Sequence, residues 1–316
     1  MNKVERIIVY SLFVAALIPL TIFDFNISSN LYNPSSVFGK IFYVGGQAPF
    51  LIFGTFVTGL AFFFRPKESK KANIWFGVLF LFMSIAMALY SGSELANGVN
   101  RLCGKPWHGF IKILMAIPFS IPRFLAGFIP AVLLRNHKSH EKEIFVFAFM
   151  ITFYALYILV FTNLLKVIAY RPRFRLLASL YEGESLASHW RPWYAWQTFL
   201  SKGNYASDLE AAGVAYSLDD FLSYPSGHTI VAIGALMIAY FPGLEDKKIW
   251  LRPLCYAFGA IVGLSRIFLG DHNATDSLFG FYLGVIAIDI LFAVVQPRFA
   301  AFLEKKNIVW PQNETV

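Results

Sequence analysis

The chain has 316 residues, of which 57% are hydrophobic and only 15% are charged, and Phe alone contributes 34. A water-soluble domain cannot hide this much apolar surface, so the composition predicts an integral membrane protein. The formal charge of +8 does not indicate nucleic acid as a partner, because the Lys and Arg residues are divided among short loops between apolar stretches. The two cysteines, Cys103 and Cys255, indicate neither a disulfide framework nor a metal site.

The predicted elements are membrane helices. A bilayer core about 30 Å thick requires roughly 20 apolar residues per helix. Eight stretches meet this requirement, in chain order 6–23, 44–64, 73–91, 108–134, 143–168, 228–243, 252–269 and 275–296. The first follows basic residues as a signal peptide would, but Asp24-Phe25-Asn26 stands where a small-residue cleavage site belongs, so we expect a retained helix. The predicted fold class is all-α, a polytopic transmembrane helical bundle.

The loops between these stretches carry unequal numbers of basic residues. More than half of the 27 Lys and Arg residues lie in the N-terminus, the C-terminal tail and every second connection, including 65–71 and 135–142. The positive-inside bias makes these segments cytoplasmic, which places both termini inside. The remaining connections then face the opposite side of the membrane: 24–43, 92–107, 169–227 and 270–274. We therefore look for chemistry in these four segments.

Stretch 108–134 is punctuated by three prolines and carries Arg123 near its middle. Prolines disrupt helices, and a charge in hydrocarbon is costly unless it faces protein or water. The pattern predicts two half-helices or a re-entrant element, and Arg123 fits a buried structural role as well as a functional one.

The connection 169–227 is too long for a plain connector in a compact helical bundle. It contains an aromatic cluster made of Trp190, Trp193, Tyr194 and Trp196. Amphipathic rings are at home at the headgroup level of a membrane. We therefore interpret the cluster as an interfacial anchor, with a substrate-recognition surface as the alternative.

The first candidate cluster ends the fifth apolar stretch and contains Lys166 and Arg173. The two residues are seven positions apart, which is two helical turns, so a continued helix would project both from one side. Basic residues also finish membrane helices by reaching the headgroups, and this simpler explanation is sufficient for the cluster on its own.

The second cluster is Tyr224-Pro-Ser-Gly-His-Thr229, directly before an apolar run. Ser226 as a helix N-cap followed by Gly227 leaves backbone N–H groups at the helix N-terminus, where an anion can bind. His228 would face that anion from the first turn. An ordinary cap with an incidental histidine is the alternative.

The third cluster bridges the seventh and eighth stretches and contains Ser265, Arg266, His272 and Asp276. His272 and Asp276 are four positions apart, hence on one face of the starting helix, where the carboxylate can accept a hydrogen bond from the imidazole. Such a bond leaves the other ring nitrogen nucleophilic. Arg266 offers a planar fork for phosphate oxygens. A non-functional pair of His and Asp is the alternative.

The topology, derived without these clusters, places all three at the non-cytoplasmic face. Two histidines, a lysine, two arginines and a helix N-terminus are the parts that metal-free phosphoryl transfer requires.

These residues resemble the signature of the type 2 phosphatidic acid phosphatase superfamily. It consists of Lys, six residues, Arg-Pro; then Pro-Ser-Gly-His; then Ser-Arg, five residues, His, three residues, Asp. The second and third elements match in full, while the first matches at Lys166 and Arg173 but has Phe174 where the pattern has Pro. An alternative register through Arg171-Pro172 leaves only four residues after the lysine, so we prefer Arg173.

The resemblance implies a lipid phosphate as substrate and a bundle of six helices, here with about two additional ones. It implies that His272 is the nucleophile, that His228 is the general acid and that Asp276 orients His272. The phosphate oxygens would be held by Lys166, Arg173, Ser226, the Gly227 N–H and Arg266. Neither a metal nor another cofactor is implied.

We accordingly divide the chain into N-terminal transmembrane helices in 1–142, a catalytic transmembrane core in 143–296 with the long loop 169–227, and a cytoplasmic tail in 297–316. A loose similarity of the N-terminal region to bacterial lipid A phosphatases suggests the bacterial inner membrane, with the active site facing the periplasm or exterior. The sequence does not indicate an oligomeric state.

Two other functions fit the same residues. In a phosphotransferase, a lipid or sugar hydroxyl instead of water would take the phosphoryl group from His272. A lipid transporter that kept the fold is the second, although intact His228, His272 and Asp276 argue against it. A weak similarity of 97–107 to 163–173 also raises an accessory anion site near Lys105, with chance similarity between helix ends as the alternative.

Overall fold

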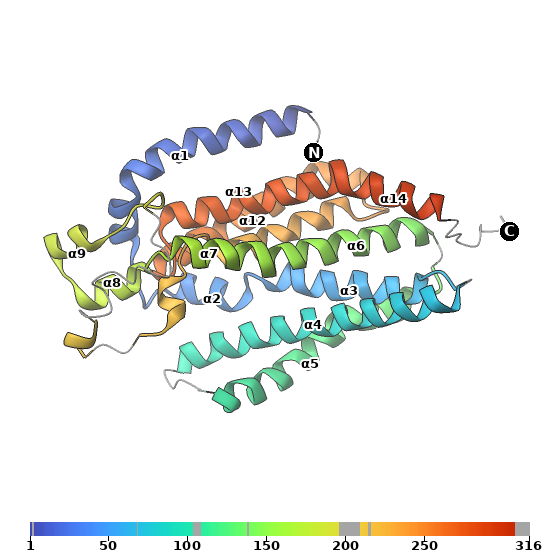
Figure 1. Ribbon diagram of the computed structural model, residues 1–316, viewed down its shortest axis with the longest axis horizontal. Helices are drawn as coiled ribbons and strands as arrows, with labels where there is room; N and C mark the ends of the chain where they lie inside the picture. The colour runs from blue at the N-terminus through green and yellow to red at the C-terminus, as the bar shows by residue number, and fades with distance from the viewer. Residues whose placement is uncertain are drawn as a thin grey trace. The chain divides into compact units, whose positions relative to one another are not determined.

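The computed structural model describes residues 1, 3–67, 69–103, 109–137, 139–195, 209–213 and 216–306. Within these ranges every regular element is a helix, which confirms the predicted all-α class (Figure 1). Lys105 and Trp196, which the sequence singled out, lie outside the described residues.

Seven helical segments of the described residues are long and apolar enough to cross a membrane. A shorter apolar segment, Gly227–Tyr240, corresponds to the predicted stretch 228–243. Together these segments account for the eight predicted stretches, and the chain is a polytopic helical membrane protein.

Contacts divide the chain into two compact units that alternate along the sequence. Unit 1 consists of Met1–Tyr43, Leu156–Ile233 and Ala257–Ile286, and unit 2 of Val44–Ala155, Gly234–Tyr256 and Ala287–Val316. The predicted division of the chain at residues 142 and 296 follows the sequence and not these contacts, and it stays a prediction.

Unit 1 takes its helices from three separate parts of the chain. The first part contains α1 (Lys3–Leu31) and α2 (Val37–Gly45). The middle part contains the π-helix Ile158–Thr162, α7 (Asn163–Ala169), α8 (Phe174–Leu180), α9 (Gly183–His189), the 3-10 helix Leu218–Phe221 and α11 (Gly227–Ile233). The last part contains the second half of α12 (Lys248–Phe268) and most of α13 (Ala274–Ile290).

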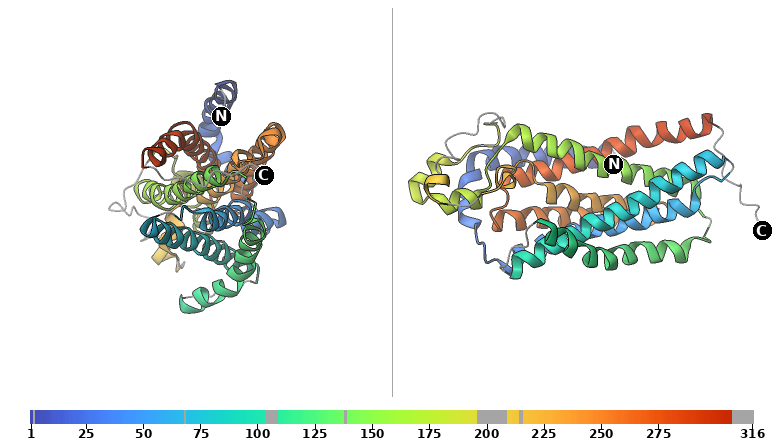
Figure 2. Two further views of the ribbon diagram at one scale, coloured as in Figure 1. Left: turned by 90° about the vertical axis from the view of Figure 1, so that its right-hand side faces the viewer. Right: turned by 60° about the horizontal axis from the view of Figure 1, so that its bottom comes forward.

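The predicted connection 169–227 contains short helices where the structure describes it, and α8 and α9 lie beyond the end of α7 (Figures 1 and 2). Tyr170 closes α7 in the left-handed conformation, with φ of 43°, and donates its N–H to the Lys166 carbonyl at 2.9 Å. This conformation costs a tyrosine roughly 1–2 kcal/mol. A parallel stack of the Tyr170 ring on Phe221, with centroids 5.1 Å apart, holds it in place. The turn leads into the extended backbone of Arg173, from which α8 starts.

Unit 2 has an aromatic core. Its elements are α3 (Ala48–Phe64), α4 (Lys70–Cys103), α5 (Gly109–Leu134), α6 (Glu141–Tyr157), the 3-10 helices Gly234–Tyr240 and Glu245–Lys247, the π-helix Leu291–Val295 and α14 (Gln296–Lys305). Phe80, Phe145 and Phe149 meet edge to face, with ring centroids 5.1–5.4 Å apart. The Thr58 and Ser84 hydroxyls lie 2.7 Å apart and bond to each other.

Stretch 108–134 forms one helix, α5, so the predicted half-helices or re-entrant element are wrong. Close packing on α3 and α4 explains how α5 continues through its three internal prolines. A Cβ atom on Gly127 would lie 2.7 Å from the Thr55 side chain of α3, and one on Gly92 of α4 would lie 2.5 Å from the backbone nitrogen of Ser120. Neighbouring helices at this distance support a transmembrane helix that proline would otherwise break.

The last predicted stretch extends further than expected. Helical structure continues through α14 to Lys305, so the first part of the predicted tail 297–316 is helix. Near the end of α14, Glu304 forms an ion pair of 2.7 Å with Lys142 at the start of α6. These two segments therefore lie at the same end of unit 2.

Candidate active site

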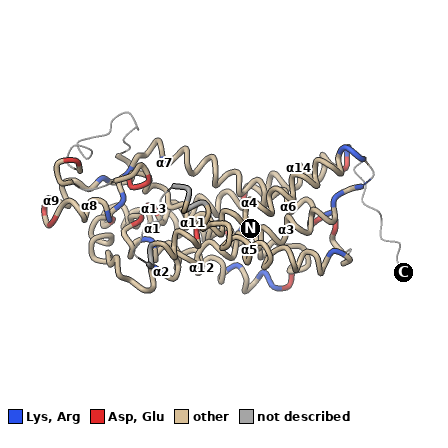
Figure 3. The backbone as a smooth tube through the Cα atoms, turned by 90° about the horizontal axis from the view of Figure 1, so that it is seen from below, with Lys and Arg blue, Asp and Glu red and all other residues tan. Residues whose placement is uncertain are grey.

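The three clusters predicted from the sequence come together in unit 1, where charged residues gather around α8, α9 and the start of α13 (Figure 3). Lys166 of α7 lies beside the second cluster, because a Cβ atom placed on Gly227 would be 3.5 Å from the Lys166 ammonium nitrogen. Arg173, Arg266 and Lys166 all act electrostatically on His272. Each cluster therefore contributes to one site.

His272 lies in the turn between α12 and α13 and is 1% exposed. Its Nδ1 atom lies 2.5 Å from the backbone carbonyl oxygen of Ser223. Because a carbonyl can only accept, Nδ1 carries the proton and Nε2 keeps its lone pair. The prediction that Asp276 accepts this hydrogen bond is wrong, because the Ser223 carbonyl takes the place expected for the carboxylate.

Asp276 instead holds Ser223 and the turn around His272. Its carboxylate accepts a hydrogen bond from the Ser223 hydroxyl at 2.5 Å and from the Asn273 N–H at 2.8 Å. It also receives Nη1 of Arg171 at 2.5 Å. Asp276 therefore positions the imidazole indirectly, through the residue whose carbonyl binds it.

Arg171 connects Asp276 to the first helix of the chain. Its guanidinium binds Asp276 at 2.5 Å and Asp24 of α1 at 2.8 Å. Asp24 also accepts from the Thr275 N–H at 3.0 Å and from the Thr275 hydroxyl. Both carboxylates are fully buried, where an unpaired charge is strongly unfavourable. The ion pairs thus hold α1 against the start of α13, and Arg171 is committed to them.

A third set of charges surrounds Asp271, which is fully buried. Three guanidinium groups meet its carboxylate: Arg266 and Arg175 by hydrogen bonds and Arg173 at 3.6 Å. Three guanidinium groups carry more N–H donors than one carboxylate accepts. Asp271 therefore holds Arg173 and Arg266, two of the cations that act on the imidazole.

Two further carboxylates, on the 3-10 helix Leu218–Phe221, bind these arginines. Asp219 pairs with Arg173 at 2.7 Å, and Asp220 pairs with Arg175 at 2.9 Å. Although burial raises the pKa of Asp220, the hydrogen bond and charge of Arg175 lower it overall. Asp220 is therefore ionised at neutral pH.

The electrostatic surroundings keep His272 neutral. Burial holds the pKa of His272 well below its ordinary value, and neighbouring cations lower it further. In decreasing order of effect these are Arg173, Arg266 and Lys166. A neutral imidazole is the nucleophilic form, and the same cations stabilise an anion that binds beside it.

The second histidine, His228, is half-exposed in the first turn of α11. Its ring stacks on the ring of Tyr43 with centroids 5.2 Å apart. The guanidinium carbon of Arg266 lies 4.5 Å from the centroid of the same Tyr43 ring. Tyr43 therefore positions the predicted general acid and one predicted phosphate-binding residue together.

Ser226 is fully buried and connects α11 to α13. Its backbone N–H donates to the Asp276 carbonyl at 3.0 Å. Its hydroxyl oxygen accepts from the Thr229 N–H at 3.4 Å and from the Thr229 hydroxyl at 2.8 Å. The predicted N-cap is thus formed, and neither bond uses the hydroxyl proton of Ser226.

Phe174, which departs from the resembled pattern, is the first residue of α8 and follows Arg173 as N-cap. Proline is favoured at this position because the first N–H of a helix has no intrahelical partner and is not missed. The helix does not require proline there, so a residue with an N–H, such as phenylalanine, can take its place. Phe174 is 1% exposed and packs against Phe25 of α1 and against Tyr32, which directly follows α1, with centroids 6.2 and 5.4 Å apart. The departure adds packing and leaves the backbone of Arg173 extended.

The described part of the aromatic cluster contacts the framework of the site. The Trp190 indole N–H donates to the Asn273 side chain at 3.2 Å, and the guanidinium carbon of Arg171 lies 5.2 Å from the Trp190 ring. The Trp193 indole N–H donates to the Thr21 hydroxyl of α1 at 3.0 Å. These contacts give both tryptophans a structural role, beside the predicted interfacial anchor or recognition surface.

The sequence motifs did not identify Asp24, Tyr43, Ser223 or Asp271 as parts of the site. A carboxylate inside an apolar membrane helix was the available signal for Asp24, because such charges are rare and usually functional. Ser223 takes part through its backbone carbonyl, for which a sequence carries no signal. Arg123, in contrast, lies half-buried on α5 of unit 2.

Fold and site together define a class: an all-helical membrane protein with cationic side chains around a neutral, oriented histidine. Comparison with known families identifies the class more closely. The sequence model of the PAP2 superfamily matches residues 144–300, and the chain belongs to this superfamily. The matched region contains every site residue predicted from the sequence, and Asp24 and Tyr43 lie before it.

A phosphatidylglycerophosphatase B of Bacillus subtilis (strain 168) is 34% identical over 70 residues, which cover 20% of this chain and 34% of that protein. The match thus spans about a third of the length of this relative. No solved structure matches the chain significantly.

Proposed function

We propose that the protein is a metal-independent phosphatase that hydrolyses a lipid phosphate, either a monoester or a pyrophosphate, through a phosphohistidine intermediate. The state of His272 carries the proposal: its Nδ1 is bound to a carbonyl and three cations surround it. Membership of the PAP2 superfamily and the similarity to a phosphatidylglycerophosphatase support the same class of reaction.

In the first step, Nε2 of His272 attacks phosphorus, and the bond from phosphorus to the lipid oxygen breaks as the new nitrogen–phosphorus bond forms. His228 donates a proton to the leaving oxygen. The other phosphate oxygens are bound by Lys166, Arg173, Arg266, Ser226 and the Gly227 N–H. Charge stabilisation of this kind is usually the largest contribution to phosphoryl transfer.

In the second step, His228, now neutral, accepts a proton from a water molecule, and the oxygen of that water attacks phosphorus. The nitrogen–phosphorus bond breaks, inorganic phosphate leaves, and both histidines return to their first state. The positive charge in both steps comes from side chains of the protein, so the proposal requires no metal ion and no other cofactor.

The substrate follows from the surroundings of the site. Apolar helices hold the protein in a bilayer, where phosphorylated lipids are the substrates at hand. Phosphatidic acid and phosphatidylglycerophosphate are the first lipids to test, the second because of the name of the Bacillus relative. A lipid A phosphate is the third, from the resemblance noted for the N-terminal region.

We also propose that both termini are cytoplasmic and that the site faces the opposite side of a bacterial cell membrane, the inner one where there are two. Lys142, at the start of α6 in a segment with cytoplasmic charge bias, pairs with Glu304 near the end of α14 at 2.7 Å. This pair supports the topology, because it joins two segments that the charge bias assigns to the same side.

A direct test compares the wild type with His272→Ala and His137→Ala, since His137 is exposed in unit 2 and serves as the control. With phosphatidic acid and EDTA, we expect the wild type and the control to release phosphate and vanadate to inhibit them. We expect His272→Ala to lose on the order of a thousandfold or more in kcat, because the nucleophile is missing. Full activity of His272→Ala would refute the assignment. Loss of wild-type activity on chelation would refute metal independence.

The same assay addresses the alternatives. A phosphotransferase shares the first step but passes the phosphoryl group to a lipid or sugar hydroxyl, so it would consume more lipid than it releases as phosphate. For the phosphatase we expect equal amounts of the two. A transporter would move a labelled lipid across vesicles even as the His272→Ala variant.

A further inference from the structure

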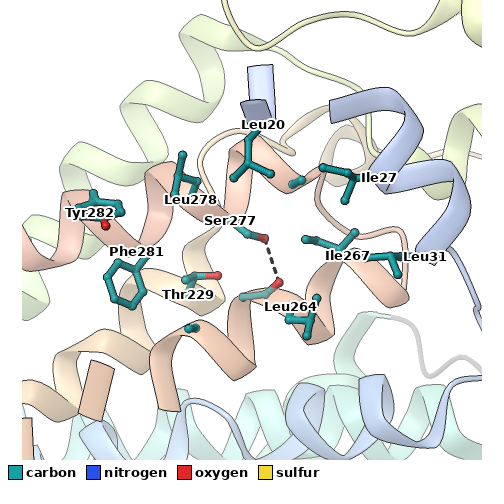
Figure 4. A pocket seen from close by; sticks show the side chains of 13 residues that line it. Leu20, Ile27, Leu31, Thr229, Leu264, Ile267, Ser277, Leu278, Phe281 and Tyr282 are labelled. Carbon is teal, nitrogen blue, oxygen red and sulfur yellow. Dashed lines mark hydrogen bonds between the residues drawn. The ribbon is translucent and has the colours of Figure 1, made fainter. Parts of the chain in front are cut away.

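Unit 1 contains an apolar cavity of about 340 Å³ between α1, α12 and α13. Figure 4 shows Leu20 and Ile27 of α1 on one side and Leu264 of α12 on the other. Ile267 of α12 and Leu278 of α13 complete the apolar wall. The volume is in the range of sites that bind small molecules or parts of larger ones.

Two hydroxyl groups on the cavity wall, those of Thr229 and Ser277, are engaged within the protein. The Thr229 hydroxyl donates to the Ser226 hydroxyl oxygen at 2.8 Å, and the Ser277 hydroxyl donates to the Gly263 carbonyl at 3.0 Å. The Tyr282 ring packs against Phe13 of α1, with centroids 4.5 Å apart. Among the described residues, no charged side chain lines the cavity. The wall therefore suits an apolar occupant.

The helices that enclose the cavity are also exposed on their outer surfaces. The most apolar window of α1 is only 11% buried, and Ile18 and Ile22, which flank Leu20, are 62% and 68% exposed. On α12, Ala260 and Leu264 line the cavity and are exposed as well. In a bilayer these surfaces face acyl chains, so the mouth of the cavity opens to hydrocarbon.

The cavity is distinct from the phosphate site. On α12, Leu264 and Ile267 line the cavity, whereas Arg266 lies over Tyr43, next to His228. None of the predicted site residues is among the described residues that line it. The cavity wall therefore carries none of the groups proposed to bind the phosphate.

We propose that this cavity binds one acyl chain of a phospholipid of the surrounding bilayer, separate from the lipid that is hydrolysed. The apolar wall, the engaged hydroxyls and the exposure of α1 and α12 identify the occupant as hydrocarbon. A chain in this position supplies the dispersion contacts that an empty cavity lacks and stabilises the packing of α1 on α13. The proposal does not depend on the reaction proposed for His272.

The test uses the full chain in vesicles of phosphatidylglycerol that carries a diazirine in one acyl chain, because this lipid is a phosphodiester and offers no phosphomonoester to the site. Irradiation cross-links the acyl chain to neighbouring residues of the protein, and mass spectrometry locates the cross-linked residues. Two variants are matched: Ala260→Phe places a ring in the mouth of the cavity, and Ala257→Phe places one on an exposed position of the same helix outside it.

We expect the wild type and Ala257→Phe to be labelled on the residues of 20–31 and 277–282 that line the cavity, such as Ile27 and Leu278. We expect Ala260→Phe to be labelled there at least about fivefold less, because the ring occupies the space of the chain. Equal labelling of Ala260→Phe would overturn the proposal, and so would labelling of these segments by a diazirine phosphatidic acid alone, which would assign the cavity to the substrate. If Ala260→Phe fails to fold, Leu264→Trp makes the same test from the same wall.

Discussion

Units 1 and 2 are both built from long apolar helices, but they bury different chemistry. Unit 1 buries ionised groups that are at most 3% exposed: Asp24, Arg171, Arg266, Asp271 and Asp276. Unit 2 buries Phe rings and hydroxyl groups, such as those of Thr55, Thr58 and Ser84. Charges in apolar surroundings are costly unless they are paired, whereas a hydroxyl can bond to a carbonyl of its own helix.

The two units differ in how far apart along the sequence the hydrogen-bonded or ion-paired residues lie. In unit 2, the Thr58 hydroxyl finds the Gly54 carbonyl one turn away, at 2.7 Å. In unit 1, Arg171 pairs with Asp24, 147 positions earlier. Removing a hydroxyl leaves the backbone hydrogen bonds of its helix intact, while removing one member of an ion pair leaves the other member as a buried charge without its partner. Substitutions in the two units should therefore differ in both size and kind.

The largest expected effect on catalysis tests whether His228 of unit 1 is the general acid. His228→Gln should lower kcat for a lipid phosphate about 10²–10⁴-fold, because no group then protonates the leaving oxygen. The measurement compares a lipid phosphate with p-nitrophenyl phosphate, whose leaving group needs no proton. The defect in kcat/KM, which does not include the second step, should be much smaller for p-nitrophenyl phosphate, and equal defects in kcat/KM with both substrates would contradict the acid role. His137→Gln is the control.

A smaller effect is expected from the ion pairs that hold α1. Asp24→Ala removes one partner of Arg171 and one acceptor of Thr275, and should lower the free energy of unfolding by about 3–5 kcal/mol. Thermal unfolding in detergent measures this change, and kcat should fall with it because Asp276 and the turn at His272 lose support. Asp246→Ala, which removes an exposed carboxylate of unit 2, should change neither quantity. Unchanged stability of Asp24→Ala would show that the network contributes little.

The pH dependence sharpens the comparison further. His272 must be neutral to attack phosphorus, and its pKa in the folded protein lies well below its ordinary value of about 6.5. Its neutral form therefore stays populated as the pH falls through 6.5. The acid limb of kcat/KM, which reports the free enzyme, should begin well below pH 6.5. Arg173→Gln should move this limb to higher pH, because one of the cations that depress the pKa is gone. A limb that does not move would contradict the electrostatic account.

The smallest effect is expected in unit 2. Thr58→Val removes the hydroxyl that bonds to Gly54 and Ser84, and should cost about 1 kcal/mol in the free energy of unfolding. We expect kcat to stay within about twofold of the wild type, since both lost hydrogen bonds lie within unit 2 and neither involves a residue of the site. A loss of activity as large as that of Asp24→Ala would break the comparison between the units.

The features that the sequence predicted depend on local patterns. Apolar windows identified the membrane helices because each window needs only its own composition. The spacing within motifs identified Lys166, Arg173, Arg266 and His272 as members of one site, and the structure places these residues together. Phe174 did not disturb the match, because the first position of a helix tolerates many residues.

The features that the sequence did not predict depend on partners far along the chain. Nothing near Asp24 indicates Arg171 or Thr275, and a spacing of four favoured Asp276 over the Ser223 carbonyl as partner of His272. The prolines predicted a broken α5, but close packing at Gly92 and Gly127 overrides them.

The carboxylate of Asp24 also constrains the order in which the protein is assembled. Asp24 lies near the start of the sequence, but its partners Arg171 and Thr275 follow 147 and 251 positions later. A carboxylate that is buried without these partners is strongly unfavourable, so α1 cannot pack stably before they are in place. It can take its final place only after α13 has left the ribosome, and the first helix to be made is therefore among the last to settle.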